Sequence, residues 1–210
     1  MYYACRSCST NTTLLAFQDV NGFVQLANAT SPYSDWSFAQ LPTAFDPALR
    51  TGLAFQPFYR SGLPDEVNLY HQTSAGNMSL ATWRDPVNDP PGGWSAAAQI
   101  YGLIPFGSPI AAASSYTNVS SGFESWIEVL SLSDQGIKVS TWLGEINDWE
   151  QYYFEPSVMA NSTENKKVYG SIAMTADGQA FSVVGKQIEG WQVGDDAVSW
   201  SSIGSIDAWP

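Results

Sequence analysis

The sequence repeats itself at intervals of about fifty to sixty residues, and this repetition limits the folds open to the chain. Four short segments each end in a tryptophan, at Trp36, Trp94, Trp149 and Trp200, and these lie 58, 55 and 51 residues apart. Small, apolar segments begin between them at positions 52, 108 and 170, with spacings of 56 and 62 residues. Two independent landmarks that share one spacing indicate copies of a single structural unit.

Each unit contains four segments typical of short β-strands. The first is small and apolar, as in residues 108–114, and the second alternates between apolar and polar residues, as in residues 67–72. A turn with glycine or asparagine separates the second strand from the third, and the repeated tryptophan opens the fourth. No stretch keeps the spacing of an amphipathic helix over three turns.

Four antiparallel strands in a unit of this length predict an all-β chain built from β-propeller blades. A sandwich or jelly roll could use as many strands but would not repeat at this interval. The expected organisation is an N-terminal tail, 1–13, and a repeat domain, 14–207, with about four blades, at approximately 14–42, 52–100, 108–155 and 170–207. Residues 1–10 do not resemble the Ala-rich first strand, so the first blade is predicted to be incomplete.

An open arc of a larger propeller, truncated at its N-terminus, fits this pattern, with a small closed ring as the alternative. An open arc exposes apolar blade faces, so self-association through those faces is expected.

The charge of the chain excludes some partners. The chain has 20 acidic and 8 basic residues, for a net charge of −12, and the basic residues are scattered. Nucleic acid and anionic lipid both require clustered Lys and Arg, so neither is an expected partner. No apolar run approaches the roughly 20 residues of a transmembrane helix, so no membrane insertion is predicted.

The sequons and the cysteines bear on location and cofactors. Five N-x-S/T sequons fall in predicted turns or strand edges, which favours a secreted or cell-surface glycoprotein. Their asparagines are Asn11, Asn28, Asn77, Asn118 and Asn161. The N-terminus lacks a secretory signal, so either the protein stays inside the cell or the true start is missing, and the rest of the sequence favours the second alternative. Cys5 and Cys8 form a lone CxxC, which fits a disulfide or an ordinary tail; with His71 as the single histidine, no metal or cofactor is expected.

The repeated unit resembles the fungal fucose-specific lectins. The motifs that carry the resemblance are an alternating second strand that ends in glutamine, a Gly-Trp fourth strand and a Ser-Pro-Ile-Ala-Ala first strand. In residues 67–116 they read Val67-Asn68-Leu69-Tyr70-His71-Gln72, Gly93-Trp94 and Ser108-Pro109-Ile110-Ala111-Ala112. The resemblance implies a six-bladed propeller that binds fucosylated glycans between adjacent blades.

The resemblance also implies a sugar pocket made by an Arg on the second strand, a Glu on the third and a nearby aromatic ring. Arg and Glu would hydrogen-bond hydroxyl groups, while the aromatic face would pack on the sugar's C–H side. This sequence has Leu15, Asn68, Glu128 and Ala180 at the Arg position. It has Gln25, Leu80, Val139 and Ile188 around the Glu position.

We therefore predict non-catalytic carbohydrate binding, of the fucose type, at clefts between blades, with glycans or glycoproteins as partners. The candidate ligand-binding residues are Trp36, Trp94, Trp149, Trp200, Asn68, Gln25 and Glu128. For the tryptophans, packing between blades is the competing interpretation.

Two other functions stay open from the sequence. One is a degenerate propeller that acts as a protein-interaction scaffold. The other is a glycoside hydrolase, which would need two carboxylates about 5–10 Å apart in one cleft. No catalytic motif is present, and no catalytic residue is predicted.

Overall fold

The computed structural model describes residues 2–5, 12–31, 33–58, 66–84, 93–119, 122–133, 136–143, 148–154, 169–175, 178–184, 186–194 and 199–207. The chain divides into two compact units, Met1–Ser108 and Pro109–Pro210. Each unit holds two four-stranded sheets whose strands follow one another in chain order. Among the residues described, no helix is long and apolar enough to cross a membrane.

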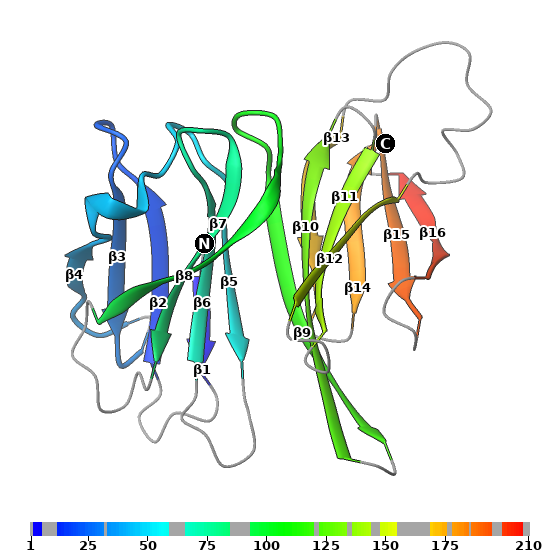
Figure 1. Ribbon diagram of the computed structural model, residues 1–210, viewed down its shortest axis with the longest axis horizontal. Coiled ribbons are helices and arrows are strands. Elements are labelled where there is room, and N and C mark those ends of the chain that lie inside the picture. Colours follow the sequence, from blue (N-terminus) through cyan, green and yellow to red (C-terminus); the bar gives the residue numbers. More distant parts are fainter. Residues whose placement is uncertain are drawn as a thin grey trace. The chain divides into compact units, whose positions relative to one another are not determined.

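The first unit contains the first and second sheets (Figure 1). The first sheet consists of β1 (Tyr2–Cys5), β2 (Thr12–Gln18), β3 (Val24–Ala29) and β4 (Ser37–Gln40). After a short 3-10 helix, Thr43–Phe45, the second sheet consists of β5 (Leu53–Phe58), β6 (Glu66–Gln72), β7 (Asn77–Arg84) and β8 (Trp94–Leu103). Every pairing in both sheets is antiparallel.

The second unit repeats this arrangement. The third sheet consists of β9 (Ile110–Val119), β10 (Gly122–Ser133), β11 (Gly136–Leu143) and β12 (Asp148–Phe154). The fourth consists of β13 (Tyr169–Met174), β14 (Gln179–Val184), β15 (Gln187–Val193) and β16 (Trp200–Asp207). These antiparallel sheets confirm the prediction of an all-β chain with about four four-stranded units.

The expectation that the first blade is incomplete is wrong. β1 pairs with β2 over four residues, from Tyr2 opposite Leu15 to Cys5 opposite Thr12. With β1 included, the first sheet has four strands, like the other three sheets. A β-ladder is made by backbone groups, so a strand can pair without the small side chains that mark the other first strands. The absence of an Ala-rich segment was therefore not evidence that a strand is absent.

The turn after the second strand has the same structure in both sheets of the first unit. Asp19 N–H donates to Phe23 O at 2.9 Å and Gly22 N–H to Asp19 O at 3.1 Å. The corresponding bonds in the second sheet are Thr73 N–H to Asn77 O at 2.8 Å and Gly76 N–H to Thr73 O at 2.9 Å. Gly22 and Gly76 have φ of +88° and +85°, a conformation that favours glycine.

A glutamine before each of these turns forms hydrogen bonds with the backbone of the segment that follows the last strand of the sheet. Gln72 is fully buried; its Nε2 donates to Ile104 O at 2.6 Å and Pro105 O at 3.2 Å, and its Oε1 accepts from Gly107 N–H at 3.1 Å. Gln18 is half-buried; its Nε2 donates to Gly22 O at 2.7 Å and Ala48 O at 2.8 Å. The terminal glutamine of the second-strand motif therefore has a structural role.

Successive residues of a strand point to opposite faces, so each sheet has two faces. We call one of them face A and the opposite one face B. Face A is the face that carries Leu14 in the first sheet, Asn68 in the second, Leu130 in the third and Phe181 in the fourth. In the first unit, face A of the first sheet packs on face B of the second. The buried residues of this contact include Leu14, Ala16, Val24 and Leu26 from the first sheet and Phe55, Val67, Leu69, Ala81 and Trp83 from the second.

The second unit is packed in the same way. Face A of the third sheet contributes Leu130, Leu132, Ile137 and Val139, and face B of the fourth contributes Ala180 and Trp191. Trp94 in the first unit and Trp200 in the second pack against these clusters as partly buried residues. In both units a tryptophan-bearing face B thus covers an aliphatic face A.

Candidate functional site

Four polar residues lie side by side across the four strands of the second sheet, on face A. The register places Gln56 of β5 opposite Asn68 of β6, Asn68 opposite Thr82 of β7, and Thr82 opposite Ser95 of β8. We call these four residues the polar row. Gln56, Asn68 and Thr82 are buried, whereas Ser95 is exposed.

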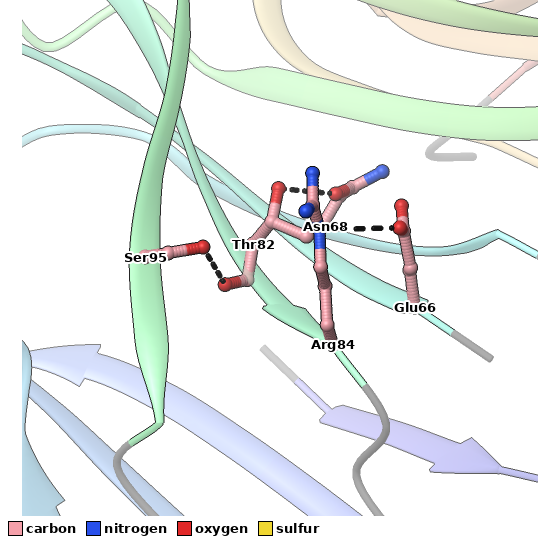
Figure 2. A network of polar contacts seen from close by, with 5 residues as sticks. All are labelled: Glu66, Asn68, Thr82, Arg84 and Ser95. Atoms are coloured by element: carbon pink, nitrogen blue, oxygen red, sulfur yellow. Dashed lines mark hydrogen bonds and ion pairs between the residues drawn. The ribbon is translucent and has the colours of Figure 1, made fainter. Parts of the chain in front are cut away.

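Hydrogen bonds join the members of the polar row. Asn68 Nδ2 donates to Gln56 Oε1 at 2.9 Å, and Thr82 Oγ1 donates to Asn68 Oδ1 at 2.9 Å. Ser95 Oγ donates to the Thr82 carbonyl oxygen at 3.2 Å. Figure 2 shows Asn68, Thr82 and Ser95 in this arrangement. The side-chain amide of the predicted residue Asn68 is therefore bonded to Gln56 and Thr82, and it orients these two side chains.

An Arg–Glu pair lies next to the polar row. Glu66 of β6 is directly opposite Arg84 of β7, and Arg84 Nε lies 3.4 Å from Glu66 Oε1 (Figure 2). The Arg84 side chain is 70% exposed and that of Glu66 is 16% exposed. The guanidinium offers hydrogen-bond donors and the carboxylate offers acceptors, which together can bind two neighbouring hydroxyl groups of one ligand.

Sequence reasoning missed this pair because it sought the Arg on the second strand and the Glu on the third. Here the order is reversed: Glu66 begins the second strand and Arg84 ends the third. The two residues lie at nearly equal distances from the turn around Gly76, so an antiparallel hairpin brings them together. That symmetry about the turn was the available signal.

The register defines which residues of the other sheets are equivalent to Asn68. In the second sheet, Asn68 lies opposite Thr82 on face A. The equivalent pairs are Leu14 opposite Asn28 in the first sheet, Glu128 opposite Thr141 in the third and Phe181 opposite Gly190 in the fourth. Asn68 and Glu128 are therefore equivalent residues in the structure, as the resemblance had implied.

Two of the predicted positions in the first sheet are corrected by one residue. Leu14, not Leu15, is equivalent to Asn68, and Leu26, not Gln25, is equivalent to Leu80. A shift of one residue turns a side chain to the opposite face of the sheet. Gln25 instead donates from Nε2 to Asp19 Oδ2 at 2.9 Å and braces the turn.

The same correction applies in the fourth sheet, where Phe181 replaces Ala180. Ala180 lies opposite Trp191, just as Val67 lies opposite Trp83, and it belongs to the buried cluster between the third and fourth sheets.

The third sheet places Glu128 of β10 between Ala113 and Thr141. The side chain of Glu128 lies outside the described part of the structure. Thr141 is buried, and its Oγ1 has no hydrogen-bond partner among the described atoms. No group of three or more His, Cys, Asp or Glu residues that could hold a metal ion occurs in the described portion of the chain.

Trp94 packs between sheets. Its ring lies 5.8 Å from that of Trp83, centroid to centroid, and 6.4 Å from that of Phe55. These rings face Leu14, Leu26 and other residues across a cleft whose volume is about 20 Å³. That is room for about one water molecule and not for a sugar ring.

The other repeated tryptophans are also partly buried. Trp200 lines the contact between the third and fourth sheets with Trp191, Leu130 and Val139, and no water-sized space is left there. Trp149 lies directly opposite Trp142 in the ladder of β11 and β12, as Trp94 lies opposite Trp83. Trp36 comes just before β4, at the position equivalent to Trp94.

The sequons occupy different environments. Asn28 lines the cleft between the first two sheets, and Asn77 is partly buried at the start of β7. Asn118 lies in β9, with a side chain outside the described part of the structure. Asn11 and Asn161 lie outside the described residues, as does Cys8.

No protein-family model and no curated protein matches the sequence. Solved structures do match the fold. AofleA from Arthrobotrys oligospora superposes with a TM-score of 0.62 at 20% identity, over 93% of this chain and 55% of that one. Aleuria aurantia lectin, which has a six-bladed β-propeller fold and a novel fucose recognition mode, has a TM-score of 0.64 at 15% identity, over 99% of this chain and 63% of that one.

A sialidase, NanB from Streptococcus pneumoniae, matches with a TM-score of 0.59 at 13% identity, over 86% of this chain and 26% of that one. The chain therefore has a β-propeller fold, as predicted, and the predicted resemblance to the fucose-specific lectins holds for the fold. This chain spans little more than half the length of AofleA and of Aleuria aurantia lectin.

Proposed function

We propose that this chain binds carbohydrate without catalysis, at face A of the second sheet, and that it is a divergent relative of the fucose-specific lectins. The observation that carries the proposal is the exposed Arg84 guanidinium beside the Glu66 carboxylate, next to the polar row. The fold shared with Aleuria aurantia lectin supports it by analogy.

The chemistry of the pair favours a neutral sugar. Glu66 compensates the charge of Arg84, so the site offers a donor and an acceptor side by side rather than a net positive charge. Two neighbouring hydroxyl groups can accept from the guanidinium and donate to the carboxylate. Exposed Ser95 at the end of the polar row adds a third polar contact. Fucosylated glycans are the first ligands to test.

The predicted residues divide between two roles in this proposal. Asn68 positions the polar row, because its amide is already bonded to Gln56 and Thr82. Trp94 and Trp200 stabilise the contacts between sheets, where no space for a sugar remains. Glu128, at the position equivalent to Asn68, is a second candidate for a polar contact.

A glycan array with the wild-type chain and two variants tests the proposal. Arg84→Ala removes the exposed donor and is expected to weaken binding about 10-fold or more, the loss of a charge-assisted hydrogen bond. Lys186→Ala is the matched control, because Lys186 is an exposed cation in a turn of the fourth sheet. The proposal is wrong if the wild type binds no glycan, or if both variants bind as well as the wild type.

A second candidate function is a protein-interaction scaffold. The observation that favours it is that apolar side chains line the cleft between the first and second sheets. There, Leu14 and Leu26 occupy the positions of the family's Arg and Glu. A pull-down with a defined partner and no glycan binding would favour this alternative. We also propose an extracellular location, which the five sequons support.

A further inference from the structure

An apolar groove lies on face A of the fourth sheet. Phe181, Ile188 and Ile203 line it together with Ile206, Ser205 and two glycines, and its volume is about 200 Å³. This exceeds the roughly 150 Å³ of an apolar cavity that binds benzene. Ile203 and Ile206 are 49% and 66% exposed, which is high for large aliphatic side chains on one surface.

A glycine keeps the groove open. A Cβ on Gly190 would lie 3.0 Å from Ile203 Cγ1 and 3.1 Å from Phe181 Cε1. Any side chain at this position would occupy the space between Phe181 and Ile203. The hollow therefore depends on a residue without a side chain, and its size suits a ring that enters from outside.

The rest of the chain shows what covers such a face. In the first unit, the aliphatic face A of the first sheet is covered by a face B that bears Trp83 and Trp94. In the second unit, face A of the third sheet is covered by a face B that bears Trp191 and Trp200. The groove is the equivalent surface of the fourth sheet, since Phe181 and Ile188 stand where Asn68 and Leu80 stand in the second.

The first sheet carries a matching face B. Phe17 and Phe38 are 39% and 67% exposed on it, Leu15 is partly exposed, and Trp36 stands at the position equivalent to Trp94. None of these residues is charged, and none of the residues that line the groove is charged. The two surfaces are thus alike in polarity and repeat the pairing of an apolar face A with a tryptophan-bearing face B.

We propose that the groove on the fourth sheet binds the first sheet of a second copy of this chain, through Phe38 and Trp36. The contact is heterologous, because two different surfaces meet, so copies associate head to tail and form a ring or a filament. The net charge of −12 opposes this association, and salt screens that repulsion. Association is therefore expected to strengthen as the ionic strength rises.

Sedimentation velocity from 1 to 100 µM on the full chain tests the proposal. Ile206→Glu alters the groove, and Phe38→Glu alters the opposing face; each is expected to weaken association about 10-fold or more. Val20→Glu is the matched control, because Val20 is 96% exposed in a turn and adds the same charge. It is expected to associate like the wild type.

An equimolar mixture of the two variants gives the sharpest result. Each variant keeps one intact surface, so the mixture is expected to form a 1:1 dimer although neither variant associates alone. The proposal is overturned if the wild type stays monomeric at every concentration. A monomer is also the result expected if another segment of the same chain fills the groove. The proposal is also overturned if Ile206→Glu associates normally, or if the mixture stays monomeric. Circular dichroism checks folding, and Ile206→Ser with Phe38→Ser repeats the test should a glutamate unfold the chain.

Discussion

Gln72→Leu is expected to destabilise the first unit, and the structure gives the size of the effect. Leucine removes the amide that bonds to Ile104 O at 2.6 Å, to Pro105 O at 3.2 Å and to Gly107 N–H at 3.1 Å. Ile104 is 4% exposed, so its carbonyl loses a partner without gaining water. A buried polar group left unpaired costs about 1–3 kcal/mol.

Gly107 and Pro105 are exposed, so water can replace part of what they lose. The full penalty therefore applies to Ile104, with a smaller contribution from the other two groups, and we expect a loss of about 2–4 kcal/mol in the free energy of unfolding. Urea unfolding followed by tryptophan fluorescence and far-ultraviolet circular dichroism measures it, since the midpoint shifts in proportion to stability.

Gln18→Leu is the matched control for Gln72→Leu. Gln18 precedes an equivalent turn and bonds to Gly22 O and Ala48 O. Ala48 is as buried as Ile104, but the Gln18 side chain is half-buried whereas that of Gln72 is fully buried, so water can reach the groups that Gln18 leaves unpaired. We expect about half the loss, or about 1–2 kcal/mol. A loss below about 0.5 kcal/mol for Gln72→Leu, or equal losses for both variants, would refute the argument that burial sets the cost.

Two further predictions concern stability. Burial lowers the pKa of His71 below its ordinary 6.5, although its Nε2 lies 3.0 Å from Phe45 O, so the unfolded chain binds its proton at a higher pH than the folded one. Stability is therefore expected to fall as the pH drops below 6.5, and His71→Leu should reduce this slope in urea unfolding from pH 7.5 to 5.0. Gly178→Ala is expected to cost about 1–3 kcal/mol, because φ is +74° and the new Cβ would clash with Val193 Cγ1. Gly204→Ala, with φ of +118° and no atom within 4 Å, should cost less; equal melting temperatures for the two would contradict this.

The proposed glycan site and the proposed self-association use different sheets and can be tested separately. Arg84 and Glu66 belong to the second sheet, whereas the groove belongs to the fourth. If both hold, association would place several glycan sites in one assembly and raise the avidity for a multivalent surface.

Much of this architecture was predictable because a blade is a local structure. The turns at Gly22 and Gly76 join strands that are neighbours in the sequence, and the alternation of residues 67–72 reports a strand without knowledge of its partners. The repeated tryptophans lie at the start of each fourth strand or one residue from it. These features depend on backbone geometry and short-range contacts, so they can be read one segment at a time.

The identity of the site residues depended on pairing. Whether Leu14 or Leu15 faces the second sheet is a matter of one residue, which strand propensity does not determine. Likewise, Glu66 and Arg84 are 18 positions apart and become a pair only when β6 and β7 form a hairpin in this register.

The amino-acid sequence alone determined that the chain contains repeated four-stranded sheets, because strand and turn signals are carried by neighbouring residues. The tertiary structure alone decided that Tyr2–Cys5 completes the first sheet, that Trp94 packs against Trp83 and Phe55, and that Ile203 and Ile206 stay exposed. The reason is that register and burial are properties of pairs of segments. They are set by which face of a sheet gains most from contact with another.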